Sequence, residues 1–169
     1  MPIDVEIDKL TNSIENIRTG EVFDTQVIRL HAINKSRLKR KDWQFNWAQE
    51  LEQQEREVHA LTTVADPDVI QGLISLQDKP GHVFVHLVEN AAFNLGRWKV
   101  YQGVAPNLFA FACKRSFELG YDGVISFISK TALKNHYQIT LGANILYGDA
   151  MAIDSVQARK LINLYFKNG

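Results

Sequence analysis

The chain has 169 residues, 46% of them hydrophobic and 22% charged, and its 19 basic and 19 acidic residues cancel. This length fits one domain with a single core, and this composition excludes disorder on a large scale. The balanced charge argues against a protein whose main task is to hold nucleic acid, and the single cysteine excludes an internal disulfide framework.

Three further features concern the compartment. No apolar run approaches the roughly 20 residues of a membrane span. The acidic, alternating start MPIDVEIDKL differs from a signal peptide. One cysteine fits a reducing environment. We therefore expect a cytoplasmic protein with no membrane and no nucleic-acid partner.

The first third of the chain holds few clear patterns. Residues 21–30 alternate as a half-buried strand does, whereas residues 48–57 are helix formers with few apolar anchors. Between them, residues 35–47 combine basic side chains with Trp43 and Trp47. Such a stretch can bind nucleic acid by charge and stacking. The interpretation we favour is a charged turn whose aromatic residues anchor this segment to the core.

The middle of the chain has the pattern of a strand meander. Three runs rich in β-branched residues cover 57–64, 69–77 and 82–89, and the turn signals ADPD and DKPG separate them. Connections this short favour antiparallel neighbours.

The period then changes to that of a helix. Residues 106–120 form an apolar helical run that opens on Pro106 and closes on Gly120. A strand at 123–129 follows. Strand, helix and strand at this spacing form a crossover unit, so we expect strands 82–89 and 123–129 to be parallel neighbours.

The last part of the chain adds a short helix at 130–142, a hairpin at 143–154 and a terminal helix. Asp154 with Gln157 resembles a capping box that opens the terminal helix. The predicted fold class is α+β: a mixed, mostly antiparallel twisted sheet flanked by helices, with a parallel strand-helix-strand unit at its centre. A homodimer through the aromatic end of the terminal helix is one alternative to a monomer.

The turn GVAP at residues 103–106 is the first candidate site. A helix begins there, and the N–H groups of a helix N-terminus bind phosphate groups. Gly103 and Ala105 let a ligand approach the backbone, because their side chains are absent or short. Taken alone, the turn fits a packing role better.

Together with its neighbours, the turn resembles the central motif of the GCN5-related N-acetyltransferase superfamily, Q/R-x-x-G-x-G/A, which binds the pyrophosphate of acetyl-CoA. Gly103, Val104 and Ala105 match its last three positions. The stretch LKNHYQITLGA resembles the family's second signature, a short helix with an aromatic residue before Leu-Gly. The stretch VENAAFNLG is similar to the glutamate-bearing strand end and loop of some bacterial members. The resemblance covers residues 69–154.

The resemblance implies an acyl-CoA N-acyltransferase-like domain over residues 1–169. Residues 1–60 would supply elements on the acceptor side, residues 69–154 the CoA-binding core and residues 155–169 the C-terminal helix. It further implies contacts with acetyl-CoA from a strand end, from the helix start and from the loop after the next strand. These residues are Leu87, Val88, Asn90, Gly103, Val104, Ala105, Pro106, Asn107, Leu108 and Lys130.

Two residues are candidates for the chemistry. Tyr137 matches the family's tyrosine that gives a proton to the leaving thiolate, and the alternative is a ring packed under the sheet. Glu89 could take the proton of the amine, directly or through a water, or attract a cationic amine; the alternative is a solvated strand end. His86 is the alternate base. His82 and His86 lie about 13 Å apart along one strand, so we expect no metal site.

Three features depart from the family's pattern. Val100 stands where the motif has Gln or Arg, Lys130 where an asparagine often contacts the cofactor, and the segment 89–102 is longer than usual. The implied function is direct transfer of an acetyl group from acetyl-CoA to a small-molecule or peptide amine in a ternary complex. The departures keep open a catalytically weak or inactive module of the same fold that binds CoA or another protein.

Overall fold

The computed structural model describes residues 2–166 of the chain. One sheet of nine strands runs through the molecule, in the order β6-β1-β2-β3-β4-β5-β7-β9-β8. The strands in chain order are β1 (Ser13–Asn16), β2 (Val22–Leu30), β3 (Arg56–Thr63), β4 (Gly72–Lys79), β5 (His82–Asn90), β6 (Tyr101–Gln102), β7 (Ile125–Ile128), β8 (Asn144–Tyr147) and β9 (Ala150–Ile153).

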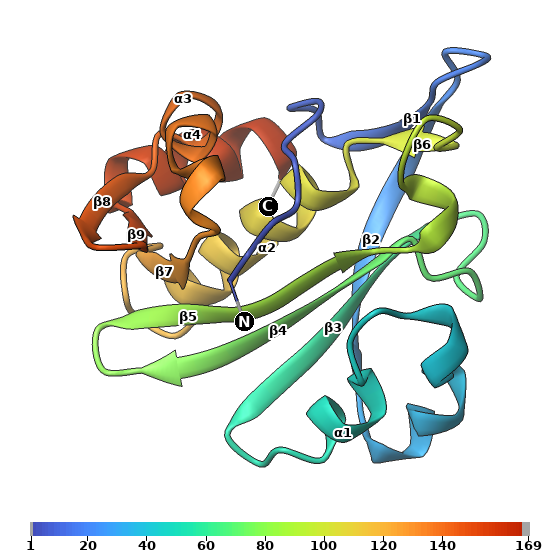
Figure 1. Cartoon of the computed structure of the whole chain (residues 1–169), viewed down its shortest axis with the longest axis horizontal. Coiled ribbons are helices and arrows are strands. Elements are labelled where there is room, and N and C mark those ends of the chain that lie inside the picture. The colour runs from blue at the N-terminus through green and yellow to red at the C-terminus, as the bar shows by residue number, and fades with distance from the viewer. Residues whose placement is uncertain (1, 167–169) are drawn as a thin grey trace.

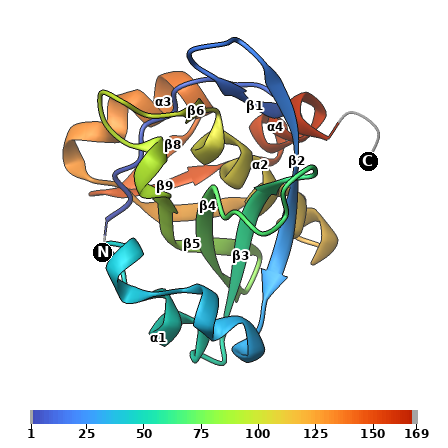
Figure 2. The ribbon, with the colours of Figure 1, turned by 90° about the vertical axis from the view of Figure 1, so that its right-hand side faces the viewer.

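Helices cover both faces of this sheet (Figures 1 and 2). The helices are α1 (Trp47–Leu51), α2 (Val104–Glu118), α3 (Lys134–Leu141) and α4 (Ser155–Tyr165), with the 3-10 helices η1 (Ala32–Arg37), η2 (Arg40–Asp42), η3 (Ala92–Asn94) and η4 (Thr131–Leu133). Helices α2, α3 and α4 lie on one face, and α1 with η1 and η2 lies on the other. None of the helices in residues 2–166 combines the length and the apolar character that a membrane crossing needs.

Each face of the sheet has its own apolar core. On the α2 face, Leu108, Phe109 and Phe127 are fully buried. On the α1 face, the core includes Trp43 and Trp47. The aromatic residues of the basic stretch therefore anchor it to the sheet, as the favoured interpretation of this stretch predicts.

Inside the sheet, β5 and β7 are neighbours and run parallel. Their register runs over three residue pairs, from Val83↔Ile125 to Val85↔Phe127. Beyond these pairs the two strands separate, and residues 2–10 run through the space between them (Figure 1). Ile3 forms a parallel bridge with Ser129, directly after β7. The N-terminal segment thus lies beside the end of β7, joined to it by this isolated bridge.

Most of the predicted elements are confirmed. The predicted strands 21–30, 57–64, 69–77 and 82–89 correspond to β2, β3, β4 and β5, which form an antiparallel meander. The parallel crossover from β5 through α2 to β7 is present. Asp154 Oδ1 accepts a hydrogen bond from the N–H of Gln157 at 2.9 Å and caps α4. Residues 1 and 167–169 of the predicted domain lie outside the described residues.

Three features differ from the sequence-based expectations. Helix α2 begins at Val104, two residues before the predicted start at Pro106, so residues 103–106 are its N-cap and first turn. Strands β1 and β6 pair with each other, and no pattern predicts them because they span only four and two residues. Residues 2–10, for which no pairing is predicted, lie beside the end of β7 through the bridge of Ile3 with Ser129.

Candidate functional site

The candidate site begins at the N-terminus of α2. Gly103 is the N-cap and has φ of +98°, a conformation that residues with a side chain rarely adopt. A Cβ atom built on Gly103 would lie 2.9 Å from the carbonyl oxygen of Ser13. Both the backbone conformation and the close approach of the start of β1 therefore require glycine here.

The carboxylate of Asp8, an anionic side chain of the same chain, binds at this helix end. Asp8 Oδ1 accepts a hydrogen bond from the backbone N–H of Gly103 at 3.0 Å. Asp8 Oδ2 lies 2.8 Å from Lys99 Nζ. A carboxylate is stabilised there because the first N–H groups of a helix have no partner within the helix and carry a partial positive charge. The side chain thus occupies the position expected for the pyrophosphate.

Asn107 holds the chain against α2. Its side chain is buried, and Asn107 Nδ2 donates to the carbonyl oxygens of Gly103 at 2.6 Å and Ser13 at 3.2 Å. In this structure Asn107, expected to contact the cofactor, binds the start of β1. Leu108 is fully buried in the core, and Pro106 is also buried in the first turn of α2.

Tyr137 lies on α3 and is fully buried. Its hydroxyl donates a hydrogen bond to the carbonyl oxygen of Val5 at 2.5 Å. Burial raises the pKa of Tyr137 well above its usual range, and the nearby charges of Asp4 and Glu6 raise it further. The phenol therefore keeps its proton, which is the state that a general acid needs.

The N-terminal segment makes backbone contacts along its length. The N–H of Ile3 donates to the carbonyl oxygen of Ile128 at 2.7 Å, and the N–H of Lys130 donates to the carbonyl oxygen of Ile3 at 2.8 Å. Further along, the N–H of Ile7 donates to Nε2 of His136 at 2.9 Å. Lys130 itself is exposed and reaches the segment only through its backbone.

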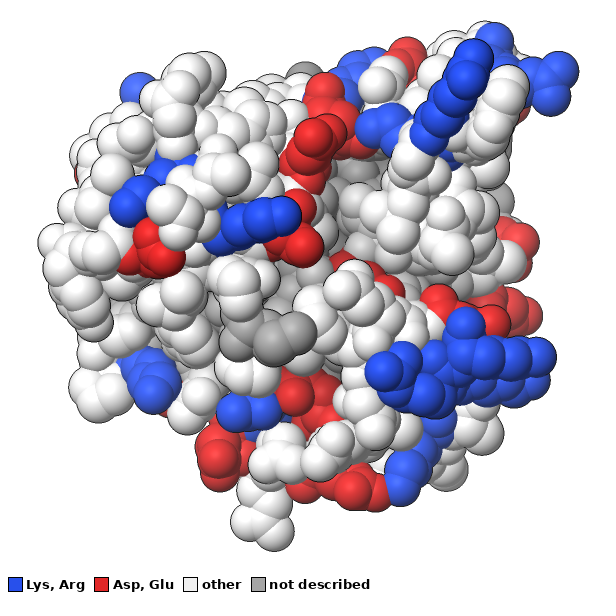
Figure 3. Space-filling view, in the orientation of Figure 1, with Lys and Arg blue, Asp and Glu red and all other residues white. Residues whose placement is uncertain are grey.

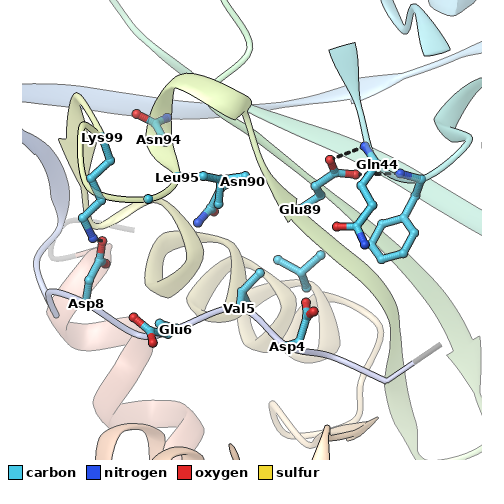
Figure 4. A pocket seen from close by; sticks show the side chains of 13 residues that line it. Asp4, Val5, Glu6, Asp8, Gln44, Glu89, Asn90, Asn94, Leu95 and Lys99 are labelled. Carbon is cyan, nitrogen blue, oxygen red and sulfur yellow. Dashed lines mark hydrogen bonds and ion pairs between the residues drawn. The ribbon is translucent and has the colours of Figure 1, made fainter. Parts of the chain in front are cut away.

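A cavity of about 540 Å³ lies beside this segment. Residues 4–8, the end of β5 and the loop before β6 form its walls, and Figure 4 shows Asp4, Glu6 and Glu89 around it. Lys99 is the one basic side chain in this lining, and it is already paired with Asp8. The lining of the cavity is therefore acidic, which favours binding of a cationic ligand.

Glu89 has a well-defined position in the cavity wall. Its side chain is buried, and its carboxylate accepts hydrogen bonds from the N–H of Gln44 at 2.6 Å, the N–H of Phe45 at 3.1 Å and Nε1 of Trp47 at 2.9 Å. Glu89 is thus no solvated strand end; it fastens the segment before α1 to β5. These partners lie more than 40 residues away, so no local pattern indicates them.

The other candidates on β5 lie nearby. Leu87, Val88 and Asn90 follow the last residue that pairs with β7, and Val88 and Asn90 line the cavity. Asn90 Oδ1 is buried and has no hydrogen-bond partner in the described part of the chain. His86 points to the α1 face, where its Nδ1 lies 2.9 Å from Glu50 Oε1. No group of three acidic, histidine or cysteine side chains that could hold a metal ion occurs in residues 2–166.

Sequence reasoning missed the role of residues 2–10, although their alternation carries a signal. Ile3, Val5 and Ile7 are buried, and the acidic residues between them face the cavity and the start of α2. Alternation of this kind is typical of a strand with one buried face.

No protein-family model matches the chain, and no curated protein matches it in sequence. Solved structures are similar to it in fold. The structure of AtaTR bound with AcCoA has a TM-score of 0.54 and 12% identity, covering 82% of this chain and 98% of that chain. FeeM, an N-acyl amino acid synthase from uncultured soil microbes, has a TM-score of 0.53 and 15% identity, covering 87% and 99%. Mutant forms of the spermidine/spermine N-acetyltransferase SpeG from Vibrio cholerae have a TM-score of 0.54 and 13% identity, covering 80% and 96%.

At these identities the similarity defines the fold. A mixed sheet with helices on both faces and a separating parallel pair at its centre is an acyl-CoA N-acyltransferase-like fold. The chain has the fold of the GCN5-related N-acetyltransferase superfamily, as the three sequence motifs predicted.

The expectation of no nucleic-acid partner is overturned by two further similar structures. These are the AtaT-AtaR complex bound to DNA, with a TM-score of 0.56 and 12% identity, and the KacTA-DNA complex, with a TM-score of 0.56 and 10% identity. Proteins with this fold are thus found in complexes that contain DNA. A zero net charge is a poor criterion, because it averages over local clusters such as the basic residues over η1 and η2 (Figure 3).

Proposed function

We propose that the chain is an acetyl-CoA-dependent N-acetyltransferase that transfers the acetyl group to a cationic amine by direct attack. The observation that carries this proposal is the bound carboxylate of Asp8 at the N-terminus of α2. A helix end that holds one anion in a fold used for acyl-CoA has the chemistry to hold a phosphate group.

The pyrophosphate of acetyl-CoA would replace the carboxylate at α2. The first-turn donors are the N–H groups of Gly103, Val104 and Ala105, because Pro106 has none. Val100 offers no polar side chain at the preceding motif position. Lys99 would supply the missing charge once its partner Asp8 has left.

The thioester would lie between β5 and β7, with Tyr137 beside it. The ammonium group first gives a proton, through water, to a carboxylate of the cavity, and the freed lone pair of its nitrogen attacks the carbonyl carbon. A C–N bond forms, the C–S bond breaks, and the leaving thiolate takes the hydroxyl proton of Tyr137. The second proton of the amine nitrogen then returns to the oxygen of Tyr137 and restores the phenol. Glu89 is the candidate that a strand of the cavity wall carries, and its hydrogen bonds also hold that wall in place. Positioning by the two strands provides much of the rate enhancement.

The acceptor would enter the cavity beside β5. Asp4, Glu6 and Glu89 attract an ammonium group and raise its local concentration. The presence of a spermidine/spermine N-acetyltransferase among the similar structures supports an amine of this kind.

A second candidate is the non-catalytic module of the same fold. One observation favours it: residues 2–10 fill the space between β5 and β7. In that case the chain would bind acetyl-CoA without turnover of any amine, or would not bind acetyl-CoA at all.

An acetyl-CoA titration followed by a panel of amines tests the proposal. We expect a calorimetric signal with acetyl-CoA and release of free CoA thiol in the presence of a polyamine or a lysine-containing peptide. Absence of binding at millimolar acetyl-CoA would contradict acetyl transfer and favour the second candidate. Binding without thiol release across the panel would leave a CoA-binding module.

A further inference from the structure

Residues 2–10 have the features of a bound ligand rather than of a core strand. Towards β7, the segment is held by the two hydrogen bonds of Ile3 with Ile128 and Lys130. At the other end, the carboxylate of Asp8 is bound to the helix N-terminus and to Lys99. Between these ends the segment contributes no strand of the sheet, only the isolated bridge of Ile3 with Ser129 (Figure 1).

The middle of the segment contacts the candidate catalytic residue. The carbonyl oxygen of Val5 accepts the hydrogen bond of Tyr137, so the phenol is directed at the segment itself. Ile7 binds the ring of His136, the neighbour of Tyr137 on α3. A thioester sulfur could reach the phenol only after the backbone of Val5 had moved away.

The segment carries a hydrophobic body and an anionic end in the order of a pantetheine arm and a pyrophosphate. Ile3, Val5 and Ile7 are buried in the core on the α2 face of the sheet, and Asp8 follows at the start of α2. Figure 4 shows Val5 and the acidic side chains running along one wall of the cavity towards Lys99.

We propose that residues 2–10 form an autoinhibitory strap that closes the acetyl-CoA channel, and that strap and acetyl-CoA exclude each other. This inference rests on the proposed function. The apparent affinity for acetyl-CoA is then the intrinsic affinity reduced by the fraction of molecules in which the strap is open. Acetyl-CoA replaces the buried apolar side chains with its pantetheine arm and the carboxylate with its phosphates.

A reducible lock tests the exclusion within a single variant, so that the loss of the buried Ile3 side chain is the same in the two states compared. Ile3 and Ser129 are bridge partners, and opposite residues of adjacent strands lie within the range that a disulfide can span. The double variant Ile3→Cys, Ser129→Cys is measured oxidised and reduced, and the buried native Cys113 takes no part. We expect the reduced protein to bind acetyl-CoA at least about tenfold more tightly than the oxidised one.

An opening variant tests the same point from the other side. Asp8→Ala removes the carboxylate that competes with phosphate and should raise the affinity for acetyl-CoA about tenfold, the effect of one charge-assisted hydrogen bond. Glu21→Ala removes the same charge from an exposed turn and is the matched control, with unchanged affinity. Hydrogen exchange at the amides of Ile3 and Ile7 reports whether the strap has opened.

The two proposals fail in different ways. Equal affinities of the oxidised, reduced and Asp8→Ala proteins would overturn the strap while leaving the proposed function intact. No binding by any of them, with exchange showing the strap open in Asp8→Ala, would overturn both. Tight binding only in the reduced and Asp8→Ala proteins supports both.

Discussion

The carboxylate of Asp8 and the backbone N–H of Gly103 are 95 positions apart in the sequence and 3.0 Å apart in the structure. This contact joins the N-terminal segment to the helix end whose sequence resembles the pyrophosphate-binding motif of the superfamily. It supports anion binding at that helix end, and it also means that the chain's own carboxylate must leave before a phosphate can bind.

The need for glycine at position 103, at the start of α2, can be tested by its effect on the free energy of unfolding. Gly103→Ala should lower the free energy of unfolding by about 2 kcal/mol or more, because a Cβ there combines a positive φ with an approach of 2.9 Å to the oxygen of Ser13. Gly20→Ala is the control, since Gly20 also has a positive φ but nothing lies within 4 Å of its Cβ position. It should cost only about 1 kcal/mol. Urea denaturation distinguishes them, and equal losses would contradict the close packing at Gly103.

Glu89 should matter for stability as well as for turnover. Glu89→Gln replaces one oxygen with a donor that faces the N–H groups of Gln44 or Phe45, so the free energy of unfolding should fall by about 2 kcal/mol. Glu21→Gln, on an exposed turn, should leave it unchanged. If Glu89→Gln abolished turnover but left the free energy of unfolding at the wild-type value, Glu89 would act as a base without a role in stability.

Tyr137→Phe tests the general acid. We expect the turnover number to fall about 100-fold or more, with acetyl-CoA affinity equal to or above that of the wild type because the contact with Val5 is lost. Tyr165→Phe is a matched control: Tyr165 is buried, and its hydroxyl accepts a hydrogen bond from the N–H of Thr11 at 2.9 Å. Its turnover should stay near the wild-type value. Equal rates for all three proteins would remove Tyr137 from the mechanism.

The stability of the fold should depend on acid pH through Glu57. Its hydrogen bond with His59, and then the hydrogen bonds and charge of Arg115, hold the pKa of Glu57 far below its usual range despite burial. A carboxyl whose pKa is lower in the folded state stabilises the fold above its unfolded pKa, and this contribution is lost as pH falls. The free energy of unfolding should therefore decrease between about pH 5 and pH 3.

The matching variant is Glu57→Gln, which should show a shallower decrease over that range. Urea titrations at several pH values give the comparison, with Glu21→Gln expected to parallel the wild type. A wild-type stability that is flat in acid would contradict the lowered pKa of Glu57.

The sequence predicts the elements that have strong local patterns. Alternation defines β2 to β5, helical period and Gly120 define α2, and the capping of α4 follows from Asp154. The motif order predicts the superfamily fold. These features depend on neighbours in sequence, so one sequence is enough to recognise them.

The features that the sequence does not predict depend on contacts between residues far apart in the chain. Residues 2–10 look like a short strand, but nothing local indicates that they pair beside β7 or that Asp8 meets Gly103. From the sequence, Glu89 could be a solvated residue at a strand end. In the structure, Gln44, Phe45 and the indole of Trp47 donate hydrogen bonds to its carboxylate. Net charge likewise hides the basic cluster over η1 and η2.

Hydrogen exchange with and without acetyl-CoA tests the central claim most directly, because it follows both occupants of the channel at once. We expect acetyl-CoA to slow exchange at Gly103, Val104 and Ala105 and to speed exchange at Ile3 and Ile7. An unchanged pattern in both segments at millimolar acetyl-CoA would contradict cofactor binding at α2, and protection of α2 with residues 2–10 still in place would contradict the strap.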